Sequence, residues 1–175
     1  MDDFDEVTLA ALRARRGDAA AATAFVQATK ADVWRLCAHL GDVSSADDLT
    51  QETYARAFTS LHRFRGKSSA RTWLLSIARR VCADAVRGAI RGRTLPARRE
   101  RLAVDIADSV TVRALIAQLG PERREAFVLT QLLGLSYSEA ADVCACPVGT
   151  IRSRVARARA DLVGALREAP AADTG

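Results

Sequence analysis

The sequence predicts an all-α protein, built as two small helical domains joined by a flexible linker. Alanine, leucine and arginine, all good helix formers, dominate the chain. No stretch alternates apolar and polar positions with the β-branched residues that are typical of strands. Residues 92–108 interrupt the helical pattern with Gly92, Pro96 and several arginines, and they lack a long apolar period. This segment is the expected linker.

The first domain is expected over residues 5–91 as four helices. Three of them begin near a side chain that can accept hydrogen bonds from first-turn amides, and turns fall where glycine interrupts the pattern. The helices are expected at 5–16, 18–40, 45–61 and 69–91, with caps at Asp18, Ser44 or Ser45, and Ser69, and turns at 40–42 and 65–67. Thr29 is a candidate break in the second helix.

The second domain is expected over residues 109–166, again as four helices. They are expected near 109–119, 121–133, 136–144 and 147–166, with Ser109 and Ser136 as caps. Pro121 and Pro147 suit the first turn of a helix, where a missing N–H costs nothing. Residues 167–175 are expected to form a disordered tail.

The composition indicates a folded protein without a membrane span. Apolar residues make up 49% of the chain and aromatic residues only 5%, so we expect small cores of Leu, Val, Ala and Ile. No apolar run approaches the roughly 18 residues of a membrane helix. The N-terminal residues MDDFDE are acidic, unlike the basic start of a secretory signal. We therefore expect a cytoplasmic protein that does not insert into membranes.

Charge alternates along the chain. The formal net charge is +5, but it is −4 over residues 1–60, +10 over 61–101, −3 over 102–146 and +2 over 147–175. Almost all basic residues are arginines, which suit bidentate recognition of phosphates and guanine edges. Two basic zones, each on a helical pattern, favour a nucleic acid as the ligand over a merely solvated surface.

Residues 133–162 have the pattern of a helix-turn-helix. Ser136 and Glu139 form a capping box at the start of the first helix. On a helical wheel, the second helix has an apolar stripe that we expect to be buried, made of Ile151, Val155, Ala158, Leu162 and Leu166.

The opposite face of that second helix is small or polar, with arginines at its margins. A helix in a DNA major groove needs this layout, because base-reading side chains lie in the middle and phosphate contacts at the edges. The central positions are Ser153, Ala156, Arg157 and Ala160, and the flanking ones are Arg152, Arg154 and Arg159. The alternative is an arginine-rich solvated face.

Two further surfaces stand out in the first domain. In residues 44–64, Asp48, Gln51 and Glu52 lie opposite an apolar face, a pattern equally consistent with solvation and with docking on a basic protein. Residues 63–91 combine a basic loop containing Phe64 with a helix whose broad apolar face runs from Trp73 to Ala85. Basic side chains interleaved with aromatic ones suit melted nucleic acid, although Trp73 also fits a core position.

Taken together, three segments resemble the extracytoplasmic-function (group IV) RNA polymerase sigma factors of the sigma-70 family. They are DDLTQETYARAF, RFRGKSSARTWLLSIARRVCADAVR and LLGLSYSEAADVCACPVGTIRSRVARARADL, in the family's order. The resemblance covers roughly residues 20–91 and 109–166, and implies that these are sigma regions 2 and 4. In the family, region 2 docks on the β′ clamp helices of core polymerase and captures the melted −10 element. Region 4 sits on the β flap and reads the −35 element as duplex.

The resemblance also implies roles for individual residues. Asp48, Gln51 and Glu52 correspond to the β′-docking face, which favours docking over solvation. The implied −10 contacts are Phe64, Arg65, Lys67, Ser68, Trp73, Arg79, Arg80 and Arg87. The implied −35 contacts are Arg152, Ser153, Arg154, Ala156, Arg157 and Arg159. The implied partners are core RNA polymerase, promoter DNA and, as in many family members, an anti-sigma factor.

Two other functions fit only part of the sequence. A stand-alone helix-turn-helix regulator with an N-terminal sensor or dimerisation domain would not need the acidic face or the basic, aromatic helix. A cysteine hydrolase would need Cys82 with His39 or His62, but Cys82 lies on the apolar face of its helix, where a thiolate is disfavoured. No cofactor or metal is expected, because Cys144 and Cys146 are too close for the usual paired zinc spacing.

Overall fold

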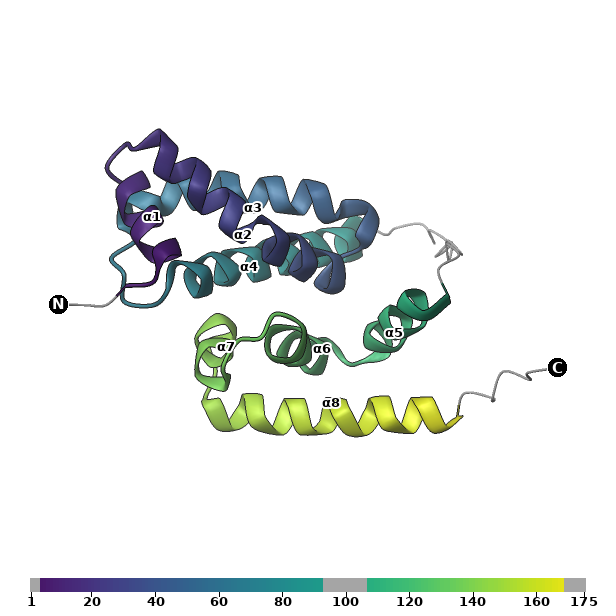
Figure 1. The fold of residues 1–175 in the computed structure, drawn as a ribbon. Coiled ribbons are helices and arrows are strands. Elements are labelled where there is room, and N and C mark those ends of the chain that lie inside the picture. Colours follow the sequence, from purple (N-terminus) through teal and green to yellow (C-terminus); the bar gives the residue numbers. More distant parts are fainter. Residues whose placement is uncertain (1–3, 93–106, 169–175) are drawn as a thin grey trace.

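A computed structural model describes residues 4–92 and 107–168, and every regular element in those two ranges is helical (Figure 1). The first four helices are α1 (Glu6–Ala14), α2 (Ala19–Leu40), α3 (Ala46–Ser60) and α4 (Ala70–Gly92). The last four are α5 (Ala107–Gln118), α6 (Pro121–Phe127), α7 (Tyr137–Cys144) and α8 (Val148–Glu168). Most of the expected linker and residues 169–175 of the expected tail lie outside the described ranges.

Most expected helix starts are confirmed by hydrogen bonds. The Asp18 carboxylate accepts from the Ala21 amide at 2.9 Å, and the Ser69 hydroxyl accepts from the Thr72 amide at 3.1 Å. Ser136 and Glu139 form the expected capping box, with both reciprocal bonds present. Two expectations were wrong. Ser45 makes no capping bond to α3, and Ser109 lies inside α5, which begins two residues earlier.

Helix α2 runs unbroken through Thr29, so the candidate break is absent. The Thr29 hydroxyl is buried and lies 2.7 Å from the Phe25 carbonyl oxygen of the preceding turn. It also contacts the Tyr54 hydroxyl of α3 at 2.7 Å. A threonine that satisfies its hydroxyl in this way stays within the helix rather than ending it.

In the second domain, two local backbone features shape the helix-turn-helix. Helix α6 continues into a π-helical turn at Val128–Leu132, so the expected helix over 121–133 is confirmed with one wide turn. Helix α7 is capped at its C-terminus by Ala145, whose φ of 52° is left-handed, and the Cys146 amide donates to the Ala141 carbonyl oxygen at 3.1 Å. This C-cap turns the chain sharply into α8.

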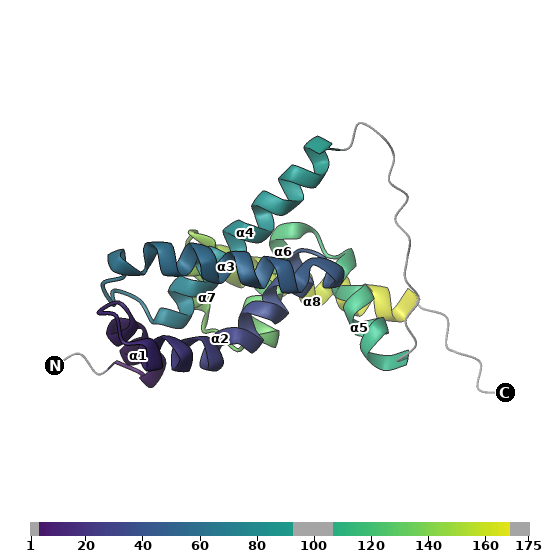
Figure 2. The ribbon, with the colours of Figure 1, turned by 90° about the horizontal axis from the view of Figure 1, so that it is seen from above.

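The two domains pack on each other. Helix α4 packs against α7, and α2 against α6, so the first domain covers one side of the second while α8 lies on the far side (Figure 1). Buried residues of both domains, such as Leu74 and Leu129, belong to one continuous hydrophobic cluster. The C-terminal turns of α4 project beyond this contact (Figure 2), which leaves Val86 and Ile90 exposed.

Candidate nucleic-acid and polymerase interfaces

The acidic face of α3 is open to solvent. Asp48, Gln51 and Glu52 are all exposed, while Leu49 and Thr53 on the other side of the helix are buried. These residues therefore form a presented surface, and its shape is set by the packing of α3 on α2 and α4.

An ion-pair chain connects this acidic face to α4. Arg56 contacts Glu52 at 2.7 Å and Asp84 at 2.7 Å, and Arg87 contacts Asp84 at 2.5 Å. The hydrogen bonds from Arg56 and Arg87 lower the pKa of Asp84, so its carboxylate stays ionised at neutral pH. Since all four groups are well exposed, these pairs order the surface more than they stabilise the fold.

The loop at residues 62–69 presents basic side chains over a buried aromatic one. Arg65 and Lys67 are exposed, and Ser68 is partly exposed. Phe64 is only 4% exposed and packs on Trp73, with ring centroids 5.0 Å apart. The expectation that Phe64 contacts DNA does not fit this geometry, because its ring is buried and packs on Trp73 instead of facing solvent. Trp73 is half-buried: it packs against the core, and the rest of its side chain is exposed to solvent.

The arginines of α4 fall into two groups. Arg80 and Arg87 are exposed, and Arg87 is paired with Asp84 of its own helix. Arg79 instead forms an ion pair with Glu125 of α6. Burial alone would lower the pKa of Arg79, but the hydrogen bond and the charge of Glu125 outweigh it and raise that pKa. Arg79 is therefore occupied by a contact between the domains in this structure.

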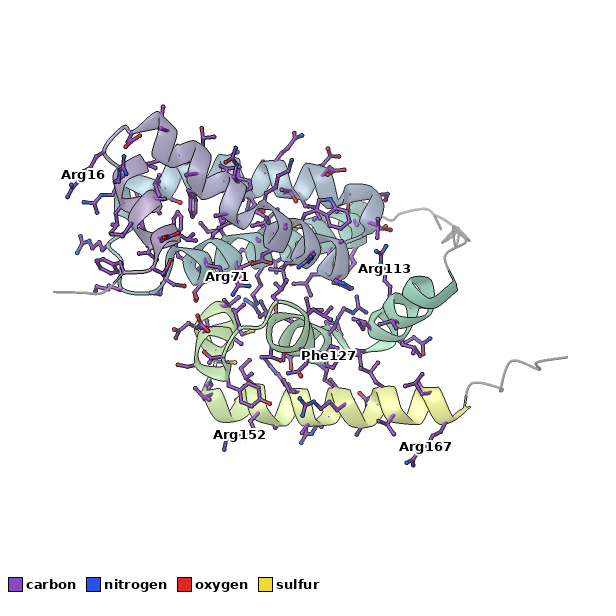
Figure 3. The ribbon with its side chains drawn as sticks, viewed as in Figure 1. Arg16, Arg71, Arg113, Phe127, Arg152 and Arg167 are labelled. Atoms are coloured by element: carbon purple, nitrogen blue, oxygen red, sulfur yellow. The ribbon has the colours of Figure 1, made fainter. Side chains whose placement is uncertain are left out.

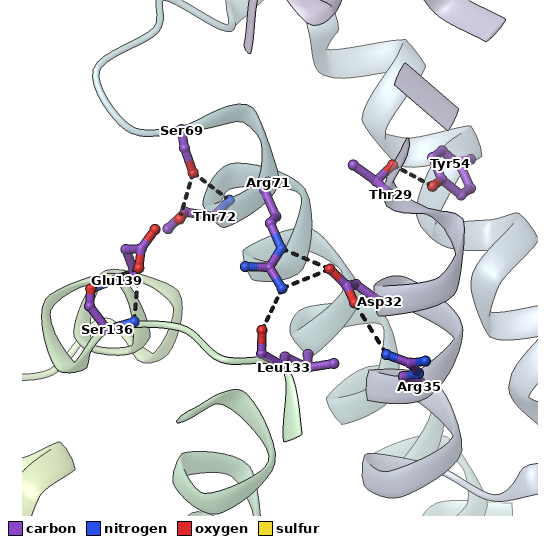
Figure 4. A network of polar contacts seen from close by, with 10 residues as sticks. All are labelled: Thr29, Asp32, Arg35, Tyr54, Ser69, Arg71, Thr72, Leu133, Ser136 and Glu139. Atoms are coloured by element: carbon purple, nitrogen blue, oxygen red, sulfur yellow. Dashed lines mark hydrogen bonds and ion pairs between the residues drawn. The ribbon is translucent and has the colours of Figure 1, made fainter. Parts of the chain in front are cut away.

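A second arginine of α4 also bridges the domains. Arg71 lies 2.7 Å from the Asp32 carboxylate of α2 and donates to the Leu133 carbonyl oxygen at 2.5 Å (Figure 4). Asp32 in turn lies 3.9 Å from Arg35. The contacts that join Arg71 to Asp32 and Arg79 to Glu125 could not be predicted from the sequence, because these partners are distant in the chain and belong to no local pattern.

Helix α8 presents the expected outward face. Arg152, Ser153, Ala156 and Arg157 are all exposed, and Ile151, Val155 and Ala158 on the opposite side are buried, as expected from the wheel. The expected burial of Leu166 was wrong, since it is 57% exposed beyond the last well-packed turn. Ala85 of α4 was also expected on the apolar face but is exposed.

Two of the flanking arginines of α8 are held by contacts with other parts of the second domain. Arg154 forms a 2.7 Å ion pair with Glu122 of α6, and Arg159 donates to the side chain of Gln131 at 2.7 Å. Arg152 points away from the first domain on the outer side of α8 (Figure 3). The two candidate DNA surfaces therefore lie on different sides of the protein, with the α8 face open and part of the α4 face covered.

No nucleophilic site is present around the cysteine singled out above. Cys82 is buried, and its hydrogen bond with Cys37, together with burial, raises the pKa of its thiol. His62 contacts the Thr59 carbonyl oxygen at 2.9 Å, and burial followed by Arg113 and Arg124 lowers the pKa of His39. This environment keeps the Cys82 thiol protonated, which argues against a hydrolase.

Within residues 4–92 and 107–168, none of the helices is both long and apolar enough to span a membrane.

Comparison with known proteins identifies the family. The Sigma-70 region 2 model matches residues 25–92, and the Sigma-70 region 4 model matches residues 109–162. The chain is 55% identical over 166 residues to the ECF RNA polymerase sigma factor SigC of Mycobacterium tuberculosis, covering 90% of this chain and 89% of that protein. It is 35% identical over 144 residues to the sigma factor EcfG of Rhodopseudomonas palustris, covering 77% and 78%.

Two solved structures share the fold. One is CnrH in complex with the cytosolic domain of CnrY, with a TM-score of 0.75 and 25% identity, covering 93% of this chain and 98% of CnrH. The other is the sigma factor RpoE with the anti-sigma factor NepR from Bartonella quintana, with a TM-score of 0.68 and 26% identity, covering 82% and 95%. Each matched region lies within one of the two helical domains described above, and the chain belongs to the extracytoplasmic-function sigma factors of the sigma-70 family.

Proposed function

We propose that this chain is a dissociable subunit of RNA polymerase that gives the enzyme promoter specificity and performs no chemistry itself. The observation that carries the proposal is the pair of separate DNA-facing surfaces on one chain. One is a regular helix face suited to duplex, and the other is a basic loop and helix suited to melted strand. A stand-alone regulator needs only the first. Such a subunit works in the cytoplasm, with the polymerase.

The acidic face of α3 is the proposed contact with the β′ clamp helices. Asp48, Gln51 and Glu52 are exposed on one side of a helix whose other side is buried. A fixed cluster of acceptors and negative charge complements a basic partner surface. The second domain is the proposed contact with the β flap.

The −10 element is proposed to meet the loop at 62–69 and α4. Arg65, Lys67 and Ser68 would surround an extruded base, while Trp73, Arg80 and Arg87 border the melted strand. Arg79 can join them only when its ion pair with Glu125 is broken. The closed arrangement of the free protein must therefore open before the −10 site is complete.

The −35 element is proposed to meet α8 as duplex. Ser153, Ala156 and Arg157 would face the base edges, with Arg152, Arg154 and Arg159 toward the backbone. The pairs that Arg154 and Arg159 make with α6 and the π turn fix these side chains at the groove margins. The small side chain of Ala156 leaves room for a close approach to the groove.

An anti-sigma factor is a proposed further partner. RpoE of Bartonella quintana, which shares this fold, was solved in complex with the anti-sigma factor NepR. A partner that bound the two domains in the packed arrangement described here would keep Arg71 and Arg79 engaged with Leu133 and Glu125.

Reconstituted transcription tests the proposal. Core polymerase is incubated with fragmented genomic DNA with and without the chain, and the 5′ ends of transcripts are mapped. We expect discrete new start sites that depend on the chain and weaken with salt. Absence of specific starts, combined with tight binding of the chain alone to a palindromic duplex, would favour the stand-alone regulator instead.

A further inference from the structure

The loop at residues 62–69 is held from one side by the N-terminal segment of the chain. This segment, Phe4 to Arg15, includes α1 and lies outside the residues matched by either family model. It contacts the loop at its start, its middle and its end. We propose that this segment positions the loop for −10 recognition, which rests on the function proposed above.

The end of the loop is fixed by Thr8. Its buried hydroxyl accepts a hydrogen bond from the Ala70 amide, the first of α4, at 2.9 Å, across 62 residues of sequence. The same hydroxyl donates to the Asp5 carboxylate at 2.8 Å. The Thr8 hydroxyl thereby links the Asp5 carboxylate to the N-terminus of α4, where a nearby negative charge is stabilising. The Ser69 hydroxyl accepts from the Thr72 amide of the same turn, so Thr8 of α1 and Ser69 of the loop together define where α4 begins.

The start of the loop is fixed by Arg15. Its guanidinium donates to the Phe64 carbonyl oxygen at 2.7 Å. This carbonyl lies where the chain leaves the short 3-10 turn at Leu61–Arg63 and becomes extended. Together with the packing of Phe64 on Trp73, the bond fixes both the backbone and the side chain of this residue.

The middle of the loop is fixed by contact with Phe4. Gly66 has a left-handed φ of +71°, and a Cβ at this position would lie 3.1 Å from the Phe4 ring. Only glycine combines this backbone conformation with so close an approach. None of the three contacts involves the side chain of Arg65 or Lys67, and both of these side chains remain exposed.

Fixing the loop at residues 62–69 affects base selection, because a pocket can distinguish one base from another only if it keeps one shape. Loosening the loop would let the same side chains accommodate the wrong base, so discrimination at the −10 element falls more than overall binding. Arg15 and Thr8 are therefore positioning residues, and neither is expected to touch DNA.

The test measures discrimination, which a general loss of folded protein would not change. Run-off transcription is compared between a promoter mapped with wild-type holoenzyme and copies that carry single changes in the −10 or the −35 element. Arg15→Met removes the donor but keeps the aliphatic stem, with the exposed neighbour Arg16→Met as its matched control. Thr8→Val removes the hydroxyl, with Thr23→Val, which breaks only a bond within α2, as its control.

We expect Arg15→Met and Thr8→Val each to reduce −10 discrimination about tenfold, the usual worth of one such hydrogen bond. The −35 discrimination and both controls should stay within about twofold. Unchanged −10 discrimination, or an equal fall at both elements, overturns the proposal. Because Arg15 lies on the surface, its variant is expected to fold even where Thr8→Val does not.

The loop variants Arg65→Ala and Lys67→Ala separate this proposal from the proposed function. If they reduce −10 discrimination while the Arg15 and Thr8 variants do not, only the positioning role is refuted. If the loop variants also leave −10 discrimination unchanged, the assignment of the loop to the −10 element fails, and the positioning role fails with it.

Discussion

The ion pair between Arg79 and Glu125 predicts how the two domains can be separated. Its two side chains are partly buried, at 31% and 11% exposed. Glu125→Arg replaces an attraction by a repulsion between two guanidiniums at the centre of the contact. Loss of a charged hydrogen bond contributes about 1.5–3 kcal/mol, and repulsion between two guanidiniums screened by water adds about 1 kcal/mol. The closed arrangement should therefore weaken by about 3 kcal/mol, or more than a hundredfold in population.

Small-angle scattering of the free protein is the assay. We expect a larger radius of gyration for Glu125→Arg, and recovery of the wild-type value when it is combined with Arg79→Glu. The control is Glu122→Arg, because Glu122 is mostly exposed and pairs with Arg154 inside the second domain. If Glu125→Arg and its control have the same radius of gyration, or if the double variant remains expanded, the ion pair does not hold the domains together.

Three further predictions follow from local features. Ala145→Gly should raise the free energy of unfolding by about 1 kcal/mol in thermal melts, because Ala145 adopts a left-handed φ of 52° that favours glycine. Burial, then the charges of Arg113 and Arg124 in the second domain, lower the pKa of His39, so the packed structure favours the neutral imidazole and is more stable above the ordinary pKa of His39. That stability should be lost as the pH falls from 7 through about 6.5 and below; scattering at pH 7.5 and 5.5 checks this, and His39→Gln should remove the dependence. Arg157→Ala should relax −35 preference by about 1–3 kcal/mol at one base pair, measured by competition between duplexes on the holoenzyme.

The helical elements were largely predictable, because their signals are local. The capping box at Ser136 and the buried stripe through Ile151 and Val155 follow from spacing along one helix, and the structure confirms both. The same periodicity was wrong at Leu166, because a pattern shows which face is apolar but not how far a partner helix covers it.

The connections between helices could not be predicted in the same way. The bond from the Ala70 amide to Thr8 and the pair between Arg79 and Glu125 join residues far apart in the chain. Neither contact produces a recognisable pattern in the sequence around its residues. Phe64 is a related case, since an aromatic residue in a basic loop fits both DNA stacking and loop anchoring. Only its 4% exposure distinguishes them.

The most direct test of the central claim is permanganate footprinting of a promoter with core polymerase. With the chain present, we expect reactive thymines in the −10 region, and a strongly reduced signal when Arg65 and Lys67 are both changed to alanine. Protection of the −35 duplex in a parallel DNase I footprint should remain in that variant, because α8 is unchanged. Melting that appears without the chain, or that is unaffected by the double change, would contradict the assignment of separate duplex-reading and strand-capturing surfaces.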